Sequence, residues 1–348
     1  MRIASVGSAF PKHYYSQEAI TAKLKAHWSG RLNSPQLLDR LYKNCAVDGR
    51  HLALTPEAYY QVNNFGEAND AWIKCALEVG EQALCRALAG AGLGPADIDA
   101  IFMISVTGIA SPSLDARLAN RLGFSANIKR IPIFGLGCVA GAAGLARAGD
   151  YVKAYPGHIA ALLAVELCTL TLQKDDISMA NLISAGLFGD GAAAVIVAGG
   201  DRLDSGPQIL ATRSVFYPDT EHIMGWDITA KGFQIVLSPN LPALIEEHFG
   251  ADVESFLGDH GLSQSDIGCW VLHNGGPRIL EATANALKLP REALDVSWDV
   301  LRRVGNLSSV SVLLVLEAFM RRRPAPGTYG LLAAMGPGFC SELVLLRW

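Results

Sequence analysis

The chain has 348 residues, of which 50% are hydrophobic and 18% are charged, and its formal net charge is −4. This composition supplies ample apolar surface for a deep core, and the length allows one large or two fused domains. A slightly acidic chain has no electrostatic attraction to nucleic acid, so no nucleic-acid partner is expected. The one basic run, Arg321–Arg323, precedes Pro324 and is predicted to be the exposed end of a helix.

The N-terminal segment and the cysteines indicate where the protein works. The segment lacks the apolar region of a signal peptide, and no stretch approaches the roughly 20 apolar residues that span a bilayer. The seven cysteines are scattered and contain no CxxC pair. That pattern is typical of reduced thiols and not of a disulfide framework or a zinc site. We therefore expect a soluble cytoplasmic protein without a membrane span or a metal site.

Apolar periodicity predicts alternating helices and strands through the first half of the chain. The predicted elements are, in chain order, a helix over 67–92, a buried strand over 100–106, a helix over 113–122, a strand over 130–134, a helix from 139 to about 154, and strands over 159–165 and 192–197. Glycines mark the turns: Gly135 and Gly137 precede the helix of small residues, and Gly189–Gly191 is predicted as a turn before the last strand.

The same order of elements begins again after Gly199 and Gly200. The second set comprises helices over 241–260, 277–287 and 308–322, and strands over 268–272, 329–334 and 342–347. Each half also carries a glycine-rich turn before its final strand, in FGDGAAAVIVAG and in MGPGFCSELVLLRW. The sequence therefore predicts a mixed α/β protein with a duplicated core, divided into residues 1–205 and 206–348.

Cys138 is the first candidate catalytic residue. It follows a buried strand and a Gly-x-Gly turn in IFGLGCVAGAAGLARAGDYV, so it lies at the start of a helix. A helix N-terminus favours the thiolate over the thiol, and a nucleophile between a strand and a helix recurs in acyl-transfer enzymes. A buried cysteine that only packs the helix against a sheet is the alternative interpretation of this segment.

Two polar residues of the second half stand in comparable places. His273 follows the strand over 268–272 and precedes a tight turn, at the carboxyl end of a strand, where open α/β sheets place their sites. Asn306, in VGNLSSVSVLLVL, lies at the predicted N-terminus of a helix. Taken singly, each residue has an alternative interpretation. For His273 it is a structural histidine, and for Asn306 it is the N-cap of the helix.

Five motifs taken together resemble the type III polyketide synthases of the chalcone synthase superfamily. In order and spacing they are GLGCVAG, LFGDGAAAVIV, LHNGGPRIL, GNLSSVSVL and the terminal MGPGFCSEL, and the resemblance runs from about residue 40 to Trp348. It implies the thiolase fold, a five-layered αβαβα arrangement duplicated within one chain, and a homodimer. It also implies an acyltransferase without a cofactor, whose substrates are the CoA thioesters acyl-CoA and malonyl-CoA.

The resemblance also implies roles for individual residues. Cys138 would accept the acyl group, with His273 and Asn306 as the other members of its triad. Phe188, in LFGDG, matches the aromatic gatekeeper between the CoA tunnel and the cavity, and Arg50 loosely matches basic residues that contact CoA phosphates. The remaining cavity positions are Trp226, typical of bacterial members, and the loop residues Gly336, Pro337 and Gly338.

These roles imply a mechanism by decarboxylative condensation. A His273 imidazolium would hold Cys138 as a thiolate, which attacks the acyl thioester. Malonyl-CoA then loses CO₂, and N–H donors of His273 and Asn306 would stabilise the resulting enolate. The enolate attacks the acyl group on Cys138, and the cycle repeats until the chain cyclises.

Two segments depart from the common pattern of that family. The turn after His273 reads Asn-Gly-Gly-Pro where many relatives have Pro-Gly-Gly-Pro, and asparagine also suits a turn. Ser111 stands near the position at which plant enzymes carry a methionine that reaches across the dimer interface. A plant-type cavity lining is therefore not expected.

Three small residues bear on the starter substrate. Thr107, Ser111 and Cys168 match positions that border a tunnel for fatty acyl chains in bacterial alkylpyrone synthases, so they are predicted to line one wall. Each buried CH₂ would contribute about 0.8 kcal/mol, which favours long-chain starters and alkylpyrone or alkylresorcinol products. Cys168 also fits tetrahydroxynaphthalene synthases, which start from malonyl-CoA.

Two further functions compete with a type III polyketide synthase: a ketoacyl synthase of the KAS III type, and a binding protein on an inactive thiolase fold.

Overall fold

The computed structural model describes residues 1–32, 34, 36–202 and 205–348. Nine of the described strands are hydrogen-bonded into one continuous sheet that divides into two stacked parts, the first and the second sheet. The first sheet has the order β5 (Lys129–Ile133), β4 (Ala100–Ile104), β6 (Ile159–Leu167), β7 (Asp190–Ala198), β1 (Arg2–Ala9). The second has the order β11 (Ile267–Leu272), β12 (Tyr329–Gly336), β13 (Cys340–Arg347), β8 (Gln208–Phe216). The two sheets join where Arg2 of β1 pairs with Gln208 of β8.

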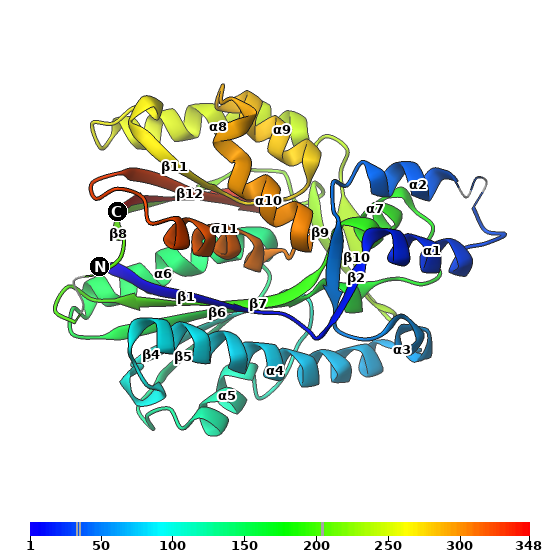
Figure 1. Ribbon diagram of the computed structural model, residues 1–348, viewed down its shortest axis with the longest axis horizontal. Coiled ribbons are helices and arrows are strands. Elements are labelled where there is room, and N and C mark those ends of the chain that lie inside the picture. Colours follow the sequence, from blue (N-terminus) through cyan, green and yellow to red (C-terminus); the bar gives the residue numbers. More distant parts are fainter. Residues whose placement is uncertain (33, 35, 203–204) are drawn as a thin grey trace.

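Helices form three layers around these sheets (Figure 1). The layer between the sheets contains α6 (Ala140–Ala154) and α11 (Ser309–Arg322). One outer layer contains α4 (Phe65–Ala91) and α5 (Leu114–Leu122), and the other contains α8 (Leu241–Gly258) and α9 (Pro277–Ala286). Helix α10 (Asp295–Val304) runs from the second outer layer to α11. The order of layers is therefore αβαβα, which confirms the predicted fold class.

Strand pairing shows that the two halves repeat one design. In the first sheet, β4 is parallel to β6, and β6, β7 and β1 follow in antiparallel order. In the second sheet, β11 is parallel to β12, and β12, β13 and β8 follow in antiparallel order. Helices α6 and α11 occupy equivalent positions in this repeat, each leading into the central parallel strand of its sheet. The predicted division between residues 205 and 206 falls in the connection from β7 to β8 and stays a prediction.

The remaining elements lie together beside the layers, at the right of Figure 1. They are the helices α1 (Gln17–His27), α2 (Gln36–Lys43), α3 (Pro56–Gln61) and α7 (Met179–Leu187) and the two-stranded sheets β2 (His13–Ser16) with β3 (Gly49–Leu52) and β9 (Met224–Thr229) with β10 (Gly232–Leu237). Short 3₁₀ helices occur at Pro95–Asp97, Gly137–Val139, Cys168–Thr171, Gln264–Asp266 and Arg291–Leu294. None of the helices within the described ranges is long and apolar enough to cross a membrane.

Burial explains why the central strands are predictable. Every residue of β6 and of β7 is buried, because helices cover both faces of the sheet, and such strands are continuous apolar runs. One predicted boundary is wrong: the sequence predicts a turn at Gly189–Gly191, but β7 already begins at Asp190. The reason is that the Asp190 carboxylate is buried and accepts hydrogen bonds from the backbone N–H groups of Ala53 and Thr169.

Candidate active site

Cys138 lies between β5 and α6, at the beginning of the first central helix. It sits in the 3₁₀ turn Gly137–Val139 and is 7% exposed. Gly137 has a φ of 55°, and a Cβ there would lie 2.7 Å from the ring of Pro337. Only glycine fits this conformation at this distance. The predicted loop of Gly336 and Pro337 therefore packs directly against the turn that carries Cys138.

The second central helix begins beside the first. Ser308 is the N-cap of α11, and the Cys138 thiol donates to its Oγ over 3.5 Å. The helices approach so closely here that a Cβ on Gly141 would lie 2.2 Å from the carbonyl oxygen of Ser309. Because helix N-termini carry partial positive charge, two such ends near one thiol favour developing negative charge at this place.

Asn306 connects this helix end to the turn after His273. Its Nδ2 donates to the carbonyl of Gly275 over 3.1 Å, and its Oδ1 accepts from the backbone N–H of Ser308 over 2.8 Å. Asn306 precedes the N-cap of α11 by two residues, so it is not the cap itself. The second N–H of its amide has no hydrogen-bond partner among the described residues and is free to donate to a substrate.

His273 follows β11, as predicted, and is 7% exposed. Its backbone N–H donates to Ala333 of β12, which fixes the residue at the end of the sheet. Its Nδ1 is buried and has no hydrogen-bond partner among the described residues. Hydrogen bonds thus link Cys138 to Ser308, Ser308 to Asn306, and Asn306 to the segment two residues after His273. The structure brings the three predicted residues to one end of the central helices.

Burial determines the charge states at this site. It raises the pKa of Cys138 to about 11 and lowers the pKa of His273 to about 4. Both shifts favour the neutral thiol and imidazole, because removal from water penalises each charged form. The predicted thiolate–imidazolium pair is therefore not the form that burial favours in the free enzyme.

Glu166, which is not among the predicted site residues, is a fully buried carboxylate near Cys138. Glu166 lies in β6 and accepts hydrogen bonds from Ser309 Oγ at 2.6 Å, from Thr107 Oγ1 at 2.8 Å and from the backbone N–H of Val106 at 3.1 Å. Burial raises its pKa to about 7, and its charge also raises the pKa of Cys138. The signal in the sequence is an isolated glutamate in an apolar strand, since such a residue is rarely buried without partners.

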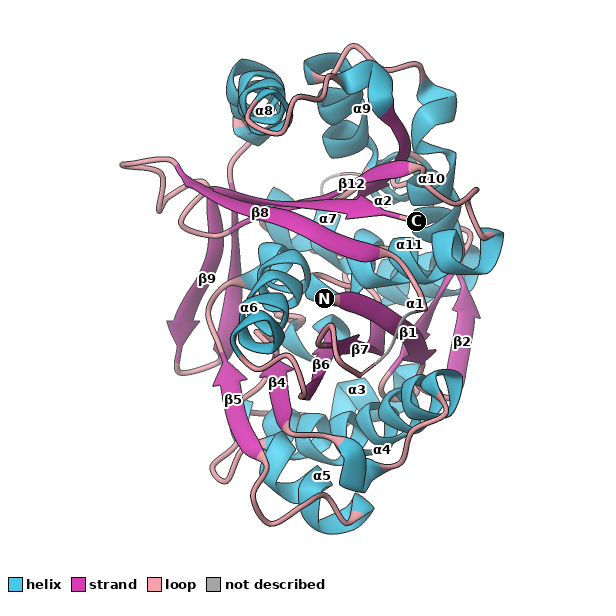
Figure 2. Ribbon diagram, turned by 90° about the vertical axis from the view of Figure 1, so that its left-hand side faces the viewer, coloured by secondary structure: helices cyan, strands magenta, loops and turns pink. Residues whose placement is uncertain are grey.

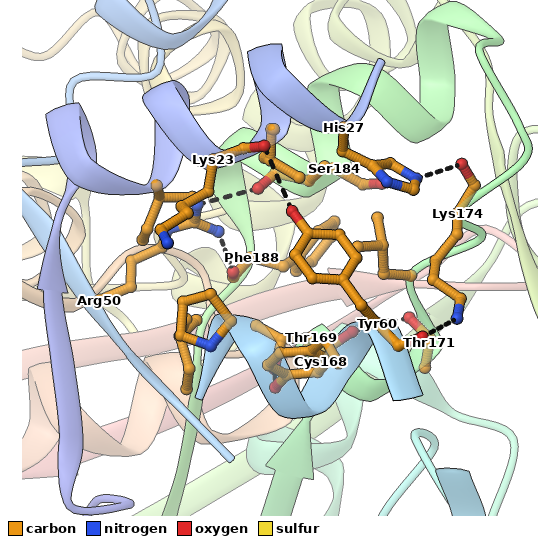
Figure 3. Close-up of a pocket in the computed structure, with 17 residues that line it drawn as sticks. Lys23, His27, Arg50, Tyr60, Cys168, Thr169, Thr171, Lys174, Ser184 and Phe188 are labelled. Carbon is orange, nitrogen blue, oxygen red and sulfur yellow. Dashed lines mark hydrogen bonds between the residues drawn. The ribbon is translucent and has the colours of Figure 1, made fainter. Parts of the chain in front are cut away.

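Phe188 follows α7 and borders a largely apolar cavity (Figure 3). An isolated bridge pairs Phe188 with Asn306, so the predicted gatekeeper is joined through the backbone to one of the three candidate catalytic residues. Arg50 lines the same cavity but is 1% exposed, and its guanidinium donates to the backbone carbonyls of Ala185 and Phe188. The structure thus places Arg50 inside the fold and does not present its charge to a phosphate at the surface.

The three predicted tunnel residues do not form one wall. Cys168 lines the cavity of Figure 3, whereas Thr107 lines a separate small cavity with Phe233. Ser111 is exposed in the segment between β4 and α5. The hydroxyl of Thr107 is also occupied, because it donates to Glu166 and accepts from the backbone N–H of Leu167 over 3.0 Å. The predicted wall fails because Ser111 is exposed and the Thr107 side chain is held by Glu166, although Thr107 lies beside Leu167, the residue before Cys168.

Trp226 and the glycine-rich loop lie on one side of the site. Trp226 is in β9, where its ring lies 6.1 Å from that of Phe233, a cavity residue outside the predicted set. Gly336 ends β12, and a Cβ there would lie 2.7 Å from the backbone nitrogen of Val139. Gly338 has a φ of 64° and closes the turn into β13.

Within the described ranges, no cluster of three His, Cys, Asp or Glu side chains could hold a metal ion.

Comparisons with known proteins match this arrangement over the whole chain. Residues 1–201 match the family model "Chalcone and stilbene synthases, N-terminal domain", and residues 208–348 match the corresponding C-terminal domain. The chain is 52% identical to 1,3,6,8-tetrahydroxynaphthalene synthase of Streptomyces peucetius subsp. caesius, over 99% of this chain and 93% of that protein. It is 35% identical to a putative chalcone synthase of Bacillus subtilis, over 99% and 98% of the two chains.

A solved structure gives the same result in three dimensions. The crystal structure of 1,3,6,8-tetrahydroxynaphthalene synthase from Streptomyces coelicolor, described as a bacterial type III polyketide synthase, superposes with a TM-score of 0.94. The two sequences are 33% identical, and the match covers 100% of this chain and 99% of that one. The likeness therefore includes both sheets and all three helical layers.

Proposed function

Because the chain belongs to the chalcone and stilbene synthase family and is a type III polyketide synthase, we propose that it makes 1,3,6,8-tetrahydroxynaphthalene from malonyl-CoA alone. The observation that carries this choice of product is the 52% identity, over 99% of the chain, to a protein of that name. The hydrogen bonds that join Cys138 to Ser308 and Asn306 to Gly275 support the condensation chemistry of the family.

The first step is acyl transfer to Cys138. Neutral His273 takes the thiol proton as the sulfur attacks the thioester carbonyl, and the thiol of CoA leaves with a proton. The negative charge on sulfur and the positive charge on imidazole then arise together and offset each other. Burial would penalise either charge if it arose alone. The product is an acyl thioester on Cys138 between the two helix N-termini.

The second step is decarboxylation of malonyl-CoA. The C–C bond to the carboxylate breaks, CO₂ leaves, and the electron pair becomes an enolate whose thioester oxygen carries the negative charge. The free N–H of Asn306 and an N–H of His273 donate to that oxygen. One preorganised donor of this kind typically contributes about 3 kcal/mol to catalysis.

Chain extension and cyclisation follow at the same site. The enolate carbon attacks the acyl carbonyl on Cys138, and the thiolate leaves, so the chain grows by two carbons and passes to CoA. The burial of Cys138 and His273 keeps water from protonating the enolate first. A naphthalene skeleton has ten carbons, so it requires the units from five molecules of malonyl-CoA.

A second candidate uses long fatty acyl-CoA starters. The observation that favours it is the cavity of Figure 3, whose lining is mostly apolar and includes Cys168 and Phe188. The separation of Thr107 and Ser111 from that cavity removes the shared wall on which this prediction depended.

We also propose that the protein is a homodimer whose interface is on the side of the molecule that carries β5. Strand β5 pairs only with β4 among the described strands, so its other edge is open. Figure 2 shows β5 and β9 on the same side of the molecule. The side chains of Phe134 and Ile228 there are 54% and 64% exposed, and in the proposed dimer the second copy of the chain covers them.

Product analysis by mass spectrometry tests the choice of product. The purified protein is incubated with malonyl-CoA alone and with malonyl-CoA plus a series of fatty acyl-CoAs, with Cys138→Ala as the control. We expect tetrahydroxynaphthalene from malonyl-CoA alone and no alkylated product. An enzyme that is idle with malonyl-CoA and makes alkylpyrones once a fatty acyl-CoA is added would refute the proposed product while leaving the family assignment intact.

A further inference from the structure

Arg50 is a buried arginine whose guanidinium binds backbone carbonyls. It lies in β3 and is 1% exposed, and a buried guanidinium is costly to desolvate unless its N–H groups find acceptors. Nη2 donates to the carbonyl of Ala185 over 2.8 Å, and Nη1 donates to that of Phe188. The buried carboxylate of Asp190 accepts instead from Ala53 and Thr169. The contacts of Arg50 therefore serve the Phe188 segment.

These two carbonyls belong to the C-terminal end of α7, which closes at Leu187. The last four carbonyls of a helix have no partner within the helix, and a cation at this end is favourable. Arg50 supplies two charge-assisted hydrogen bonds there from a different part of the chain, 135 and 138 residues away in sequence. Phe188 is thus fixed from β3 as well as from its own helix.

The same backbone is joined to Asn306. The N–H of Gly189 donates to the carbonyl of Asn306 over 2.9 Å, and the N–H of Asn306 donates to that of Leu187 over 3.0 Å. The Arg50 side chain also packs against the residue before Asn306, since a Cβ on Gly305 would lie 3.0 Å from its Cδ. Arg50 therefore contacts both sides of the two-segment bridge that holds the gatekeeper and the catalytic amide.

We propose that Arg50 is a positioning residue for condensation, which fixes the bridge between Phe188 and Asn306 and thereby aims the Asn306 amide at the thioester oxygen. The proposal rests on the roles assigned above to Phe188 and Asn306. It replaces the expectation that Arg50 binds CoA phosphates, and the two roles have opposite kinetic signatures. Loss of a phosphate ligand raises KM, whereas loss of positioning lowers kcat.

The test compares Arg50→Lys and Arg50→Met with the wild type and with Arg40→Lys, an exposed arginine of α2, as the control. Lysine keeps the positive charge but cannot make the two hydrogen bonds of the planar guanidinium, so Arg50→Lys is a milder change than Arg50→Met. We expect Arg50→Lys to lower kcat for condensation by at least about fivefold while KM for malonyl-CoA stays within about twofold. Arg50→Met should lose more, and the control should match the wild type.

Hydrogen exchange gives a readout that does not depend on the product. The amides of Gly189 and Asn306 should exchange faster in Arg50→Lys, because the bridge that protects them loosens. Hydrogen exchange in Arg50→Lys also tests the proposal if Arg50→Met fails to fold. Unchanged exchange at both amides would overturn the proposal, as would a salt-dependent rise in KM with an unchanged kcat. Neither outcome depends on whether tetrahydroxynaphthalene is the product.

Discussion

At the scale of single residues, the cluster around Cys138 predicts a division of labour. Cys138→Ala should abolish condensation, because alanine cannot hold the acyl chain. Cys138→Gln should also lose condensation but keep decarboxylation of malonyl-CoA, which needs the donors of His273 and Asn306 and not the sulfur. Release of ¹⁴CO₂ from labelled malonyl-CoA and product analysis measure the two activities separately.

The same assay tests the role assigned to Asn306. Asn306→Ala removes the amide that hydrogen-bonds Gly275 and Ser308 and that is free to donate to the enolate. Decarboxylation should fall by about 100-fold or more, the usual effect of losing one such donor. Decarboxylation at the wild-type rate in a folded Asn306→Ala protein would leave this residue with a structural role only.

The neutral state of the free site predicts how Cys138 reacts with alkylating agents. With a pKa near 11, the thiolate fraction keeps growing with pH through the neutral and alkaline range. The rate of alkylation of Cys138 by iodoacetamide should therefore rise steadily between pH 6 and about 10. A rate that is already constant from about pH 5 would indicate a thiolate held by imidazolium and contradict this assignment.

At the scale of elements, buried strands and the helices that follow them are predictable because helices cover both faces of the first sheet. In β6, for example, residues 159–165 form an unbroken apolar run, and this predicted range lies within Ile159–Leu167. Strand β1 escapes prediction because its buried positions include Ser5, Gly7 and Ser8, so no regular apolar pattern marks its buried face. Helix α10 escapes it because its buried side chains are split between two cores.

The site shows the same limit on prediction from sequence. Cys138 and His273 become candidates because they mark the start of a helix and the end of a strand, but Asn306 is joined to them only by the resemblance of the five motifs. Glu166 cannot be assigned a role, since its partners Ser309 and Thr107 are 143 and 59 residues away. Side-chain direction is likewise decided by tertiary contacts: Thr107 hydrogen-bonds Glu166 and Leu167, so it does not line the cavity of Cys168 although it lies beside that residue.

Glu166 joins β6 to the first residue of α11, and this link predicts how stability depends on pH. Its folded pKa of about 7 lies above the ordinary glutamate value of 4.5, so the folded state binds more protons than the unfolded state between these values. The unfolding free energy contributed by Glu166 is therefore largest below pH 4.5 and falls by about 3 kcal/mol as the pH rises through 7.

Glu166→Gln removes this titration. Although the variant loses acceptor contacts at every pH, its unfolding free energy relative to the wild type should increase by about 3 kcal/mol between pH 4.5 and 8. Chemical denaturation at several pH values measures this difference, and Glu254→Gln, an exposed position on α8, is the matched control. A difference that is constant with pH would show that the pKa of Glu166 is not shifted in the folded protein.

At the scale of the whole molecule, the open edge of β5 and the apolar side chains near it predict a dimer. The ring of Phe134 lies 6.3 Å from that of Phe233, and Phe233 is paired with Ile228 in the neighbouring two-stranded sheet. Two exposed apolar side chains, Phe134 and Ile228, thus lie at the end of β5 and on β9, two strands that are at the left of Figure 2. Burial of such surface contributes about 25 cal/mol per Å², and a stable interface typically buries about 1,600 Å² in total.

The dimer prediction is tested by adding charge on this side. Light scattering should give twice the chain mass of 37.1 kDa for the wild type, and Phe134→Asp combined with Ile228→Asp should give the monomer mass, because two carboxylates on each partner would be buried without counter-charges. Tyr14→Asp is the control, since Tyr14 is 50% exposed and lies by β1, at the opposite end of the first sheet from β5. A dimer that survives the double substitution but dissociates in the control would place the interface at β2, the strand of Tyr14, instead.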